Sequence, residues 1–230
     1  MLIIVPTPIG NLGDLTFRAL ETLKQADAII CEDTRRTQIL LKHYQVENKL
    51  ISYHEHSDVS QTELILVKLR EGQRLALVSD GGTPLLSDPG FKLVRRVREA
   101  GMPVETLPGA SSITTALVAS GLATDTFTFF GFLPPKSAAR KKNLEELEER
   151  EETLIFFESP YRLIKTLNDM QTVLGDREAV VARELTKKFE EMIRGKLSEI
   201  LSRLKKKEAK GEMVLLVAGK NRKSLFAEKE

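Results

Sequence analysis

The stretch SDGGTPLLSDPG at Ser79–Gly90 concentrates residue types that bind small polar ligands. Its aspartates accept hydrogen bonds, its serines and threonine donate and accept them, and its glycines let a ligand come close to the backbone. The stretch lacks the lysine of the phosphate-binding pattern G-x-x-x-x-G-K-[ST]. We therefore predict a loop that binds a small polar ligand, and not a P-loop.

Three shorter polar segments in the first half also follow apolar runs. Pro6–Asp14 (PTPIGNLGD) and Leu107–Ser112 (LPGASS) offer glycines and helix N–H groups, which suit a carboxylate or a ribose hydroxyl. Cys31–Arg36 (CEDTRR) places acids roughly 20 residues after the first glycines, where a dinucleotide-binding domain holds ribose. The complete G-x-G-x-x-G pattern is absent. A tight turn, helix capping and a nucleotide-binding module therefore all stay open.

Acidic and basic side chains follow two apolar runs in the second half. Glu158 in FESPYR and Glu184 in ARELTKK are candidates for a general base, and Lys187 is a candidate electrostatic partner. The plain alternative is a set of solvated or internally paired charges. Neither G-x-S-x-G nor H-E-x-x-H occurs in the sequence, so nothing indicates a serine hydrolase or a zinc protease.

Basic residues cluster locally, although the formal net charge of the chain is only +2. Arg35 and Arg36 stand at a predicted helix start, where the helix dipole disfavours cations, and this indicates a task such as holding an anion. Two further clusters suit a phosphate backbone, with a solvated helix face as the plain alternative. They are 136–142, which contains Lys136, Arg140, Lys141 and Lys142, and 203–210.

Other kinds of site find little support. His54 and His56 share a face of a predicted strand, but no third ligand pattern accompanies them, so we predict no metal site. Cys31 is the single cysteine, which excludes an intrachain disulfide and fits a reducing, cytoplasmic setting. The first residues do not resemble a signal peptide. No apolar run approaches the roughly 18 residues that a membrane span needs.

Elements that position these segments can be predicted from hydrophobic patterning. Short apolar runs alternate with amphipathic stretches in the first half, which is typical of a parallel α/β sheet with helices on both faces. Ligands bind beyond the carboxyl ends of such strands, so the polar segments should meet at one edge. In the second half we predict a mixed sheet. The predicted domains are 1–121 and 122–230, and the predicted helices of the second are 136–150, 161–174 and 197–207.

Eight motifs, taken in order, resemble the tetrapyrrole methylase superfamily of S-adenosylmethionine-dependent methyltransferases. Within it, the chain is similar to the bacterial group that methylates the 2′-oxygen of a cytidine ribose in 16S ribosomal RNA near the decoding centre. Gly81 departs from the family pattern, which has alanine there. The chain also lacks the G-D-P-type loop of members that modify tetrapyrroles. The motifs are PTPIGNLGD, CEDTRRT, SDGGTPLLSDPG, LPGASS, GFLPPKS, FESPYR, ARELTKKFE and GEMVLLVAG.

The resemblance implies a two-domain α/β fold with a mostly parallel first sheet, a mixed second sheet and a cleft between the domains. It implies that this cleft binds folded S-adenosylmethionine, largely through backbone groups, with Gly109 helping to permit close approach. It also implies a homodimer. The implied cofactor contacts are Pro8, Ile9, Gly10, Asp80, Gly82, Thr83, Ser112, Ile113, Phe157, Ala182 and Met213.

The implied reaction moves a methyl group from a sulfonium to a ribose oxygen, with alignment supplying much of the rate and a base or cation assisting the hydroxyl. Asn11 and Asp88 are candidate orienting residues. The implied partner is 16S rRNA or the small ribosomal subunit. A superfamily methylase acting on a tetrapyrrole or protein side chain, and a non-catalytic α/β nucleotide-binding module, are the alternatives. The catalytic candidates are Glu158, Glu184, Arg183 and Lys187, and the candidate phosphate contacts are Arg35, Arg36, Arg140, Lys141 and Lys142.

Overall fold

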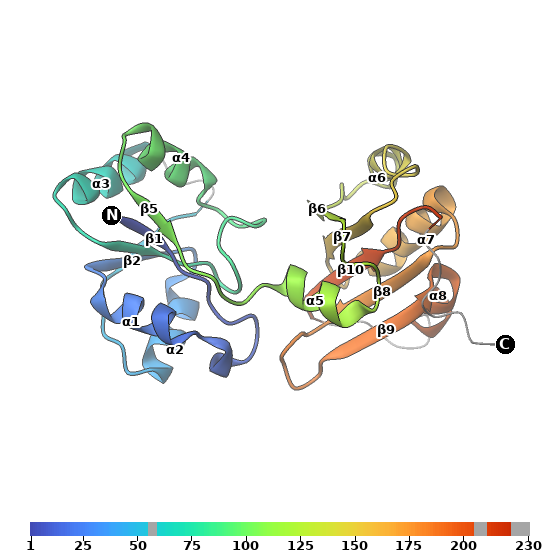
Figure 1. Cartoon of the computed structure of the whole chain (residues 1–230), viewed down its shortest axis with the longest axis horizontal. Helices are drawn as coiled ribbons and strands as arrows, with labels where there is room; N and C mark the ends of the chain where they lie inside the picture. Colours follow the sequence, from blue (N-terminus) through green and yellow to red (C-terminus); the bar gives the residue numbers. More distant parts are fainter. Residues whose placement is uncertain (55–58, 205–210, 222–230) are drawn as a thin grey trace. The chain divides into compact units, whose positions relative to one another are not determined.

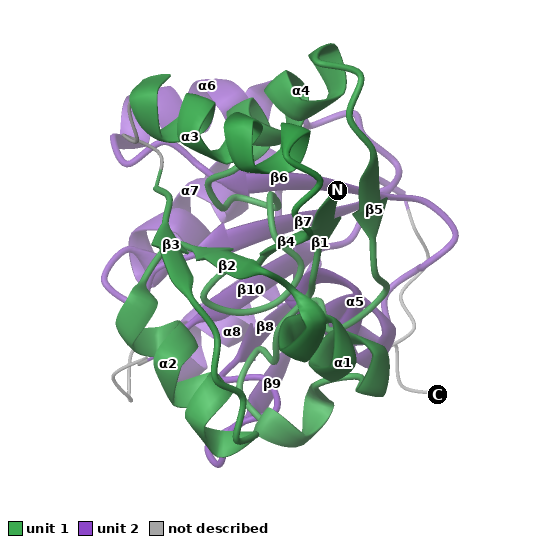
Figure 2. Cartoon of the chain, turned by 90° about the vertical axis from the view of Figure 1, so that its left-hand side faces the viewer, with its two compact units in different colours: residues 1–111 green, residues 112–230 purple. Residues whose placement is uncertain are grey.

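The chain forms two compact units in a computed structural model that describes residues 1–54, 59–204 and 211–221. Unit 1 comprises residues 1–111 and unit 2 residues 112–230 (Figure 2). The division falls one helix earlier than the predicted boundary after residue 121. This helix, α5 (Ser112–Ser120), packs against strands β8 (Glu178–Arg183) and β10 (Met213–Val217), and therefore belongs with unit 2.

Unit 1 contains a parallel sheet with the strand order β3-β2-β4-β1-β5. The three inner strands are buried along their whole length. Because helices cover both faces of this sheet, its inner strands are apolar on both sides instead of alternating. The strands are β1 (Leu2–Ile4), β2 (Ala28–Cys31), β3 (Leu50–Ser52), β4 (Leu75–Leu77) and β5 (Val104–Thr106).

The helices of unit 1 form layers on the two faces of the sheet (Figure 1). Helices α1 and α2 pack over one face, where Ile29 and Val78 lie. Helices α3 and α4 pack over the other, where Ile30 and Leu77 lie. The predicted arrangement of helices on both sides of a parallel sheet is confirmed. The helices are α1 (Phe17–Gln25), α2 (Thr34–His43), α3 (Val59–Arg70) and α4 (Phe91–Glu99), with the short 3₁₀ helix η1 (Leu12–Asp14) before them.

Polar side chains fix where the first two α-helices begin. The Thr16 hydroxyl accepts a hydrogen bond from the N–H of Ala19 (3.1 Å) at the start of α1. The Asp33 carboxylate accepts one from the N–H of Arg35 (2.9 Å) at the start of α2. Such caps satisfy N–H groups that have no partner inside the helix. These caps therefore fix where α1 and α2 begin.

Unit 2 contains a mixed sheet with the order β6-β7-β10-β8-β9. Strand β6 is parallel to β7, whereas β10 is antiparallel to both β7 and β8, and β9 is antiparallel to β8. The prediction of a mixed sheet is confirmed. Strand β10 lies in the middle and is buried along its whole length. The other strands are β6 (Phe127–Phe132), β7 (Thr153–Glu158) and β9 (Glu191–Lys196).

Three helices cover one face of this sheet (Figure 1). Side chains from helices α6, α7 and α8 form one core with Phe156, Val181 and Leu215 of the strands. Helix α5 packs against β8 and β10 on the other face. The helices are α6 (Ser137–Glu145), α7 (Leu163–Leu174) and α8 (Leu197–Leu204).

A β-bulge interrupts β6 near its end. Phe129 pairs with Ile155, but Phe132 pairs with Phe157, so β6 uses one residue more than β7 over this distance. Gly131 has φ +65°, a left-handed conformation that favours glycine. Because side chains alternate along a strand, the extra residue moves Phe132 to the same face as Phe129. The ring centroids of Phe132 and Phe157 are 5.6 Å apart.

The predicted helix over 136–150 is too long, since α6 ends at Glu145. Glutamates follow one another from Glu145 to Glu149 around Leu147, and their charges are unfavourable beside the negative end of the helix dipole. Some predicted features lie outside the described residues. They are the helix cap at 57–58, His56, the end of the helix over 197–207, most of the basic cluster 203–210, and nearly all of the chain after Lys220.

Candidate active site

Loops that follow three strands of unit 1 are joined at the carboxyl edge of the sheet. Thr7, after β1, donates its N–H to the carbonyl of Gly82, after β4 (3.0 Å), and accepts the N–H of Gly82 (2.8 Å). The Thr7 hydroxyl donates to the carbonyl of Ser79 (3.1 Å). The Thr83 hydroxyl donates to the carbonyl of Ala110, after β5 (3.0 Å). The prediction that these segments meet at one edge is confirmed.

Two glycines make this convergence possible. A Cβ on Gly109 would lie 2.7 Å from Cβ of Pro6, which is closer than real Cβ atoms approach. A Cβ on Gly82 would lie 3.2 Å from Cγ2 of Ile9, and Gly82 also has φ +87°. The predicted reason for these glycines is close approach of a ligand. In the structure they permit close contact between the loops themselves.

Asp80 links the loop after β4 to the end of β2. Its Oδ1 accepts a hydrogen bond from the N–H of Asp33 (3.3 Å), and its Oδ2 lies 3.4 Å from Nη1 of Arg36. Arg35 pairs with Asp33 (Nη2 to Oδ2, 2.7 Å), and hydrogen bonding from Arg35 lowers the pKa of Asp33 to about 2. Both arginines thus stand beside carboxylates, which offsets their unfavourable place at the start of α2.

One polar segment in each unit contains strained backbone. Leu85 (φ 77°) and Ser87 (φ 68°) lie in SDGGTPLLSDPG, and Glu184 (φ 50°) and Thr186 (φ 63°) lie in ARELTKK. Left-handed backbone is uncommon for residues other than glycine and unusual for a β-branched residue such as threonine. Such conformations cluster at ligand-binding and catalytic sites, where the surrounding structure holds them. The strain therefore supports a functional role for both segments.

Strand register brings the predicted site residues of unit 2 to one end of its sheet. Met213 of β10 pairs with both Glu158 and Arg183, and the next position along β10 pairs with both Phe157 and Ala182. Because side chains alternate, Phe157 and Ala182 lie on the face that α5 covers. Glu158, Arg183 and Met213 lie on the face that α6, α7 and α8 cover. The side chain of Met213 is part of the core there.

The Glu158 carboxylate is occupied by partners within unit 2. Its Oε1 accepts hydrogen bonds from the N–H of Ser159 (2.7 Å) and from the Arg162 guanidinium (2.9 Å from Nε and 2.7 Å from Nη2). Its Oε2 accepts one from the Thr166 hydroxyl. The side chain is 1% exposed. This geometry argues against Glu158 as the general base and indicates that it holds Arg162 in place.

Lys187 bridges two glutamates in the loop after β8. Its Nζ lies 3.1 Å from Oε1 of Glu184 and 3.0 Å from Oε2 of Glu212. Burial acts to lower the pKa of Lys187, but the hydrogen bonds to Glu212 and Glu184 outweigh it, so this pKa is raised. Burial acts to raise the pKa of Glu184, yet its contacts with Lys187 and with the N–H of Glu212 lower it overall. Lys187 therefore stays cationic, and Glu184 is a weak base.

The Arg183 guanidinium has a buried donor that lacks a hydrogen-bond partner among the described residues. Its Nη1 lies 3.2 Å from Oε2 of Glu191. Its Nε is buried and has no hydrogen-bond partner among the described residues. An unsatisfied buried donor is rare in folded proteins, and a missing ligand is one of its ordinary explanations. The sequence places an arginine here, but it carries no signal of which nitrogen is left without a partner.

The burial of Arg140 contradicts its predicted contact with a phosphate. It is buried, with 1% of its surface exposed, and its Nη2 lies 2.6 Å from Oδ2 of Asp169. Lys141 lies 3.7 Å from Oδ1 of the same aspartate. Lys142 is exposed, as a phosphate contact requires. A basic run on a helix cannot reveal which cation turns inward, because the inward face depends on a partner from another helix.

The remaining predicted contacts lie in both units. In unit 1, Pro8 and Ile9 are half-buried and Gly10 is exposed. In unit 2, Ser112 is the first residue of α5, and Ile113 is buried within that helix. Asn11, a predicted orienting residue, caps η1 by accepting a hydrogen bond from the N–H of Gly13 (3.0 Å).

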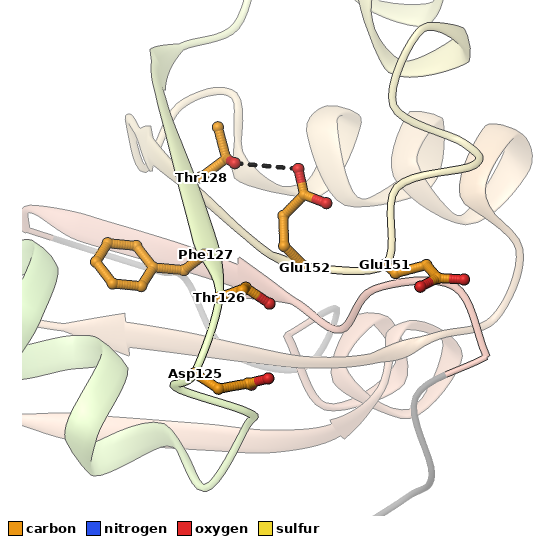
Figure 3. A pocket seen from close by; sticks show the side chains of 6 residues that line it. All are labelled: Asp125, Thr126, Phe127, Thr128, Glu151 and Glu152. Carbon is orange, nitrogen blue, oxygen red and sulfur yellow. Dashed lines mark hydrogen bonds between the residues drawn. The ribbon is translucent and has the colours of Figure 1, made fainter.

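A hollow of about 720 Å³ lies at the opposite end of the sheet in unit 2. The Thr128 hydroxyl donates to Glu152 (3.1 Å), and the ring of Phe127 points away from the acidic side chains (Figure 3). No sequence pattern singles out this hollow, because its residues lie at or just before the starts of β6 and β7 instead of following strands. Its lining is Asp125, Thr126, Phe127, Thr128, Glu151 and Glu152.

Neither a metal-binding cluster nor a membrane-spanning helix is present among the described residues. Within 1–54, 59–204 and 211–221, no group of three or more His, Cys, Asp or Glu side chains is arranged to hold a metal ion. The helices in the same ranges are too short or too polar to cross a membrane. The predicted absence of a metal site remains a prediction.

A family comparison connects this geometry to known proteins. The model of the family described as Tetrapyrrole (Corrin/Porphyrin) Methylases matches residues 1–201. The chain belongs to the tetrapyrrole methylase family. Membership confirms the family and the α/β fold class predicted from the eight motifs.

Curated relatives within the tetrapyrrole methylase family are similar over nearly the whole chain. A Bacillus subtilis protein is 48% identical over 230 residues, which cover 100% of this chain and 79% of that protein. A Haemophilus influenzae protein is 50% identical over 223 residues, covering 96% of this chain and 79% of that protein. Both are named Ribosomal RNA small subunit methyltransferase I.

Solved structures of family members share the fold at lower sequence identity. A cobalt precorrin-4 methyltransferase aligns with a TM-score of 0.71 and 18% identity, covering 94% of each chain. A uroporphyrin-III C-methyltransferase from Thermus thermophilus, complexed with S-adenosylhomocysteine, aligns with a TM-score of 0.65 and 19% identity. That alignment covers 94% of this chain and 96% of the other. At these identities the likeness shows the fold alone.

Proposed function

We propose that this chain is an S-adenosylmethionine-dependent methyltransferase that methylates the 2′-oxygen of a cytidine ribose in 16S rRNA near the decoding centre. One observation carries the proposal: relatives that are 48% and 50% identical over nearly the whole chain are named Ribosomal RNA small subunit methyltransferase I. The choice of a cytidine, of its 2′-oxygen and of the decoding centre comes from the motif resemblance.

The chemistry of the loops suits S-adenosylmethionine, which carries a cationic sulfonium and an adenosine rich in hydrogen-bonding groups. Glu32, Asp33 and Asp80 give the carboxyl edge of unit 1 several carboxylates, and burial followed by the charge of Asp80 raises the pKa of Glu32. In unit 2, Arg183 places a cation at the carboxyl end of β8. The proposed cofactor contacts remain the eleven predicted from the motifs, with buried Ile113 contributing its backbone. They are Pro8, Ile9, Gly10, Asp80, Gly82, Thr83, Ser112, Ile113, Phe157, Ala182 and Met213.

Residues of the loop after β8 would act on the hydroxyl that accepts the methyl group. The cofactor supplies an already activated methyl group, so alignment of donor and acceptor carries much of the rate. Lys187 and Arg183 are cations suited to stabilising negative charge that develops on the 2′-oxygen. Glu184, with its lowered pKa, is better suited to orienting Lys187 than to removing a proton.

The substrate in this proposal is 16S rRNA within or outside the small ribosomal subunit. Lys142 is exposed on α6, and it keeps its proposed role as a phosphate contact. Arg35 and Arg36 are exposed as well, although each stands beside a carboxylate. A homodimer in the cytoplasm completes the proposal, and sedimentation of the purified chain tests its oligomeric state.

Radiolabelled S-adenosylmethionine tests this function directly. Purified chain is incubated with small ribosomal subunits from cells that lack the modification, with free 16S rRNA, and with a uroporphyrinogen. We expect label in the rRNA, at a cytidine whose 3′ phosphodiester resists alkaline hydrolysis because its 2′-oxygen is methylated. Label in the tetrapyrrole or in ribosomal protein alone would overturn the RNA proposal. Absence of any transfer, despite cofactor binding, would favour the non-catalytic nucleotide-binding module.

A further inference from the structure

Two aromatic side chains are exposed at the end of the unit 2 sheet where Glu158 and Arg183 lie. Phe132, the last residue of β6, is 55% exposed, and Tyr161, three residues after the end of β7, is 93% exposed. Strands β6 and β7 are parallel neighbours, so their carboxyl ends lie side by side (Figure 1).

A hydrogen bond joins the two loops that carry these side chains. Arg162, which follows Tyr161, donates through Nη1 to the carbonyl of Leu133, which follows Phe132 (3.3 Å). Arg162 is itself fixed by the buried carboxylate of Glu158. The bulge at Gly131 also sets the direction of Phe132 by turning it to the face of Phe157. The two rings therefore belong to one surface.

The backbone beneath this surface is rigid. The carbonyls of Pro134 and Pro135 each accept a hydrogen bond from Nη1 of Arg140 (3.2 Å). Arg140 is buried and paired with Asp169. Proline has little backbone freedom, and these carbonyls have fixed donors. A surface that is already ordered binds with a smaller entropy cost.

The exposed charged residues that follow the two rings most closely in the sequence are positive. Lys136 and Lys165 each lie four residues beyond one of the rings, and both are exposed. Neither lysine forms an ion pair with another described residue. The loop sequences LPPK (133–136) and SPYR (159–162) contain no acid. The adjacent Glu158 is buried and neutralised by Arg162. This local charge suits a polyanion.

We propose that Phe132 and Tyr161 form a stacking surface for unpaired bases of an RNA strand whose phosphates contact Lys136 and Lys165. Proteins recognise single-stranded RNA by stacking bases on aromatic rings beside cations. Protein interfaces are depleted of lysine, so a protein partner fits this surface less well. The inference rests on the proposed function and deepens it, because it adds contacts to bases where the sequence predicted contacts to phosphates.

Binding of a fluorescein-labelled, C-rich 12-nucleotide RNA, followed by anisotropy, tests the surface. We expect Phe132→Ala and Tyr161→Ala each to weaken binding by roughly 5- to 150-fold, as the loss of one stacked base predicts. An RNA of the same length with abasic positions should lose much less affinity on the same substitutions. Lys136→Ala should make the affinity for RNA depend less steeply on salt. This variant should still bind the normal RNA more tightly than the abasic RNA.

Phe127→Ala is the matched control, because Phe127 is also exposed on β6 but lies at the opposite end of that strand. Phe132→Leu, which keeps an apolar contact with Phe157, separates the loss of stacking from a loss of folding. Unchanged binding by folded Phe132→Leu and Tyr161→Ala would overturn the proposal. Equal losses on normal and abasic RNA would overturn it as well. Weakened binding to small subunits, with normal binding to the RNA, would identify a ribosomal protein as the partner instead.

Methyl transfer by the unaltered chain separates this inference from the proposed function. If the chain methylates 16S rRNA, and Phe132→Ala and Tyr161→Ala do so with an unchanged KM, the proposed stacking surface is contradicted and the proposed function is supported. If the chain stacks RNA through both rings but methylates no rRNA, the surface stands and the proposed function is wrong.

Discussion

Lys187 is held by two carboxylates, and its charge decides what the loop after β8 can do. A protonated ammonium can stabilise a developing negative charge, and the raised pKa keeps it protonated at neutral pH. We expect Lys187→Ala to lower kcat by about 10²- to 10³-fold, as removal of one charge-stabilising donor does in other enzymes. Calorimetry should show an unchanged cofactor Kd. If Lys187→Ala keeps full turnover, this lysine has no part in the reaction.

The same ion pairs predict how the stability of unit 2 depends on pH. The lowered pKa of Glu184 gives stability that is present above its unfolded value of about 4.3 and is lost as pH falls through its folded value. The raised pKa of Lys187 gives stability that is present below about 10.4 and is lost as pH rises through its folded value. Urea unfolding should therefore show Glu184→Gln to be less stable than the unaltered chain at pH 7. The free energies of unfolding of the two proteins should converge in acid. A constant difference down to pH 2 would contradict the lowered pKa of Glu184.

Arg140 and Lys142 are close in sequence but should respond differently to replacement. Arg140→Ala removes the buried ion-pair partner of Asp169, and breaking a buried pair in this way typically costs about 3–5 kcal/mol of folding free energy. Lys142→Ala removes an exposed charge, so stability should change by less than about 0.5 kcal/mol. The Lys142 variant should instead bind RNA with a shallower salt dependence. Denaturant unfolding and salt titration measure the two effects, and equal destabilisation by both substitutions would contradict the structure.

Sequence patterns predict which polar residues stand at strand ends better than they predict the hydrogen-bond and ion-pair partners of those residues. The strand-end positions of Glu158, Glu184 and Arg183 could be predicted, because a strand that ends in polar residues is visible in one sequence. The hydrogen-bond partners of the Glu158 carboxylate could not be predicted. Arg162 and Thr166 reach it only because the chain turns from β7 into α7. The burial of Arg140 depends on Asp169 of another helix, and no local pattern encodes that pairing.

Loop contacts in unit 1 depend on glycines, and two of these glycines should tolerate a methyl group differently. Gly109→Ala places a Cβ 2.7 Å from Cβ of Pro6, so one loop must move, at an expected cost of about 1–3 kcal/mol. Gly81→Ala brings its Cβ 3.3 Å from the carbonyl oxygen of Pro8, which a small shift accommodates. Its effect should stay within about 1 kcal/mol of zero. Denaturant unfolding compares the two, and a smaller loss for Gly109→Ala would contradict the loop packing.

Elements themselves were largely predictable, because each buried strand is a short apolar run between turn residues. The strands Ala28–Cys31, Phe127–Phe132, Thr153–Glu158 and Glu178–Arg183 consist mainly of such apolar runs. The order of strands in each sheet was not predictable. It depends on which faces pack together across long stretches of chain, and hydrophobic patterning carries no record of those pairings. The bulge in β6 could not be predicted for a similar reason, because it is defined by the register of β6 with β7.

The boundary between the two units can be tested with fragments of the molecule. Helix α5 buries Ile113, Ala116 and Leu117 within unit 2. A fragment of residues 112–230 should therefore unfold cooperatively, whereas one of residues 122–230 should expose the sheet face that α5 covers and aggregate. Circular dichroism and sedimentation distinguish these outcomes. If both fragments fold equally well, α5 does not belong to the core of unit 2, and the predicted boundary after residue 121 is the better one.

Strand β10 joins unit 2 from the far end of its sequence, although it occupies the centre of the sheet. On the ribosome, β7 and β8 are made well before the strand that must separate them, and each has an unpaired inner edge until residues 213–217 emerge. The sheet of unit 1 is complete once residue 106 has been made. Unit 1 can therefore finish folding during translation, while unit 2 needs protection from wrong strand pairing until residues 213–217 have been made.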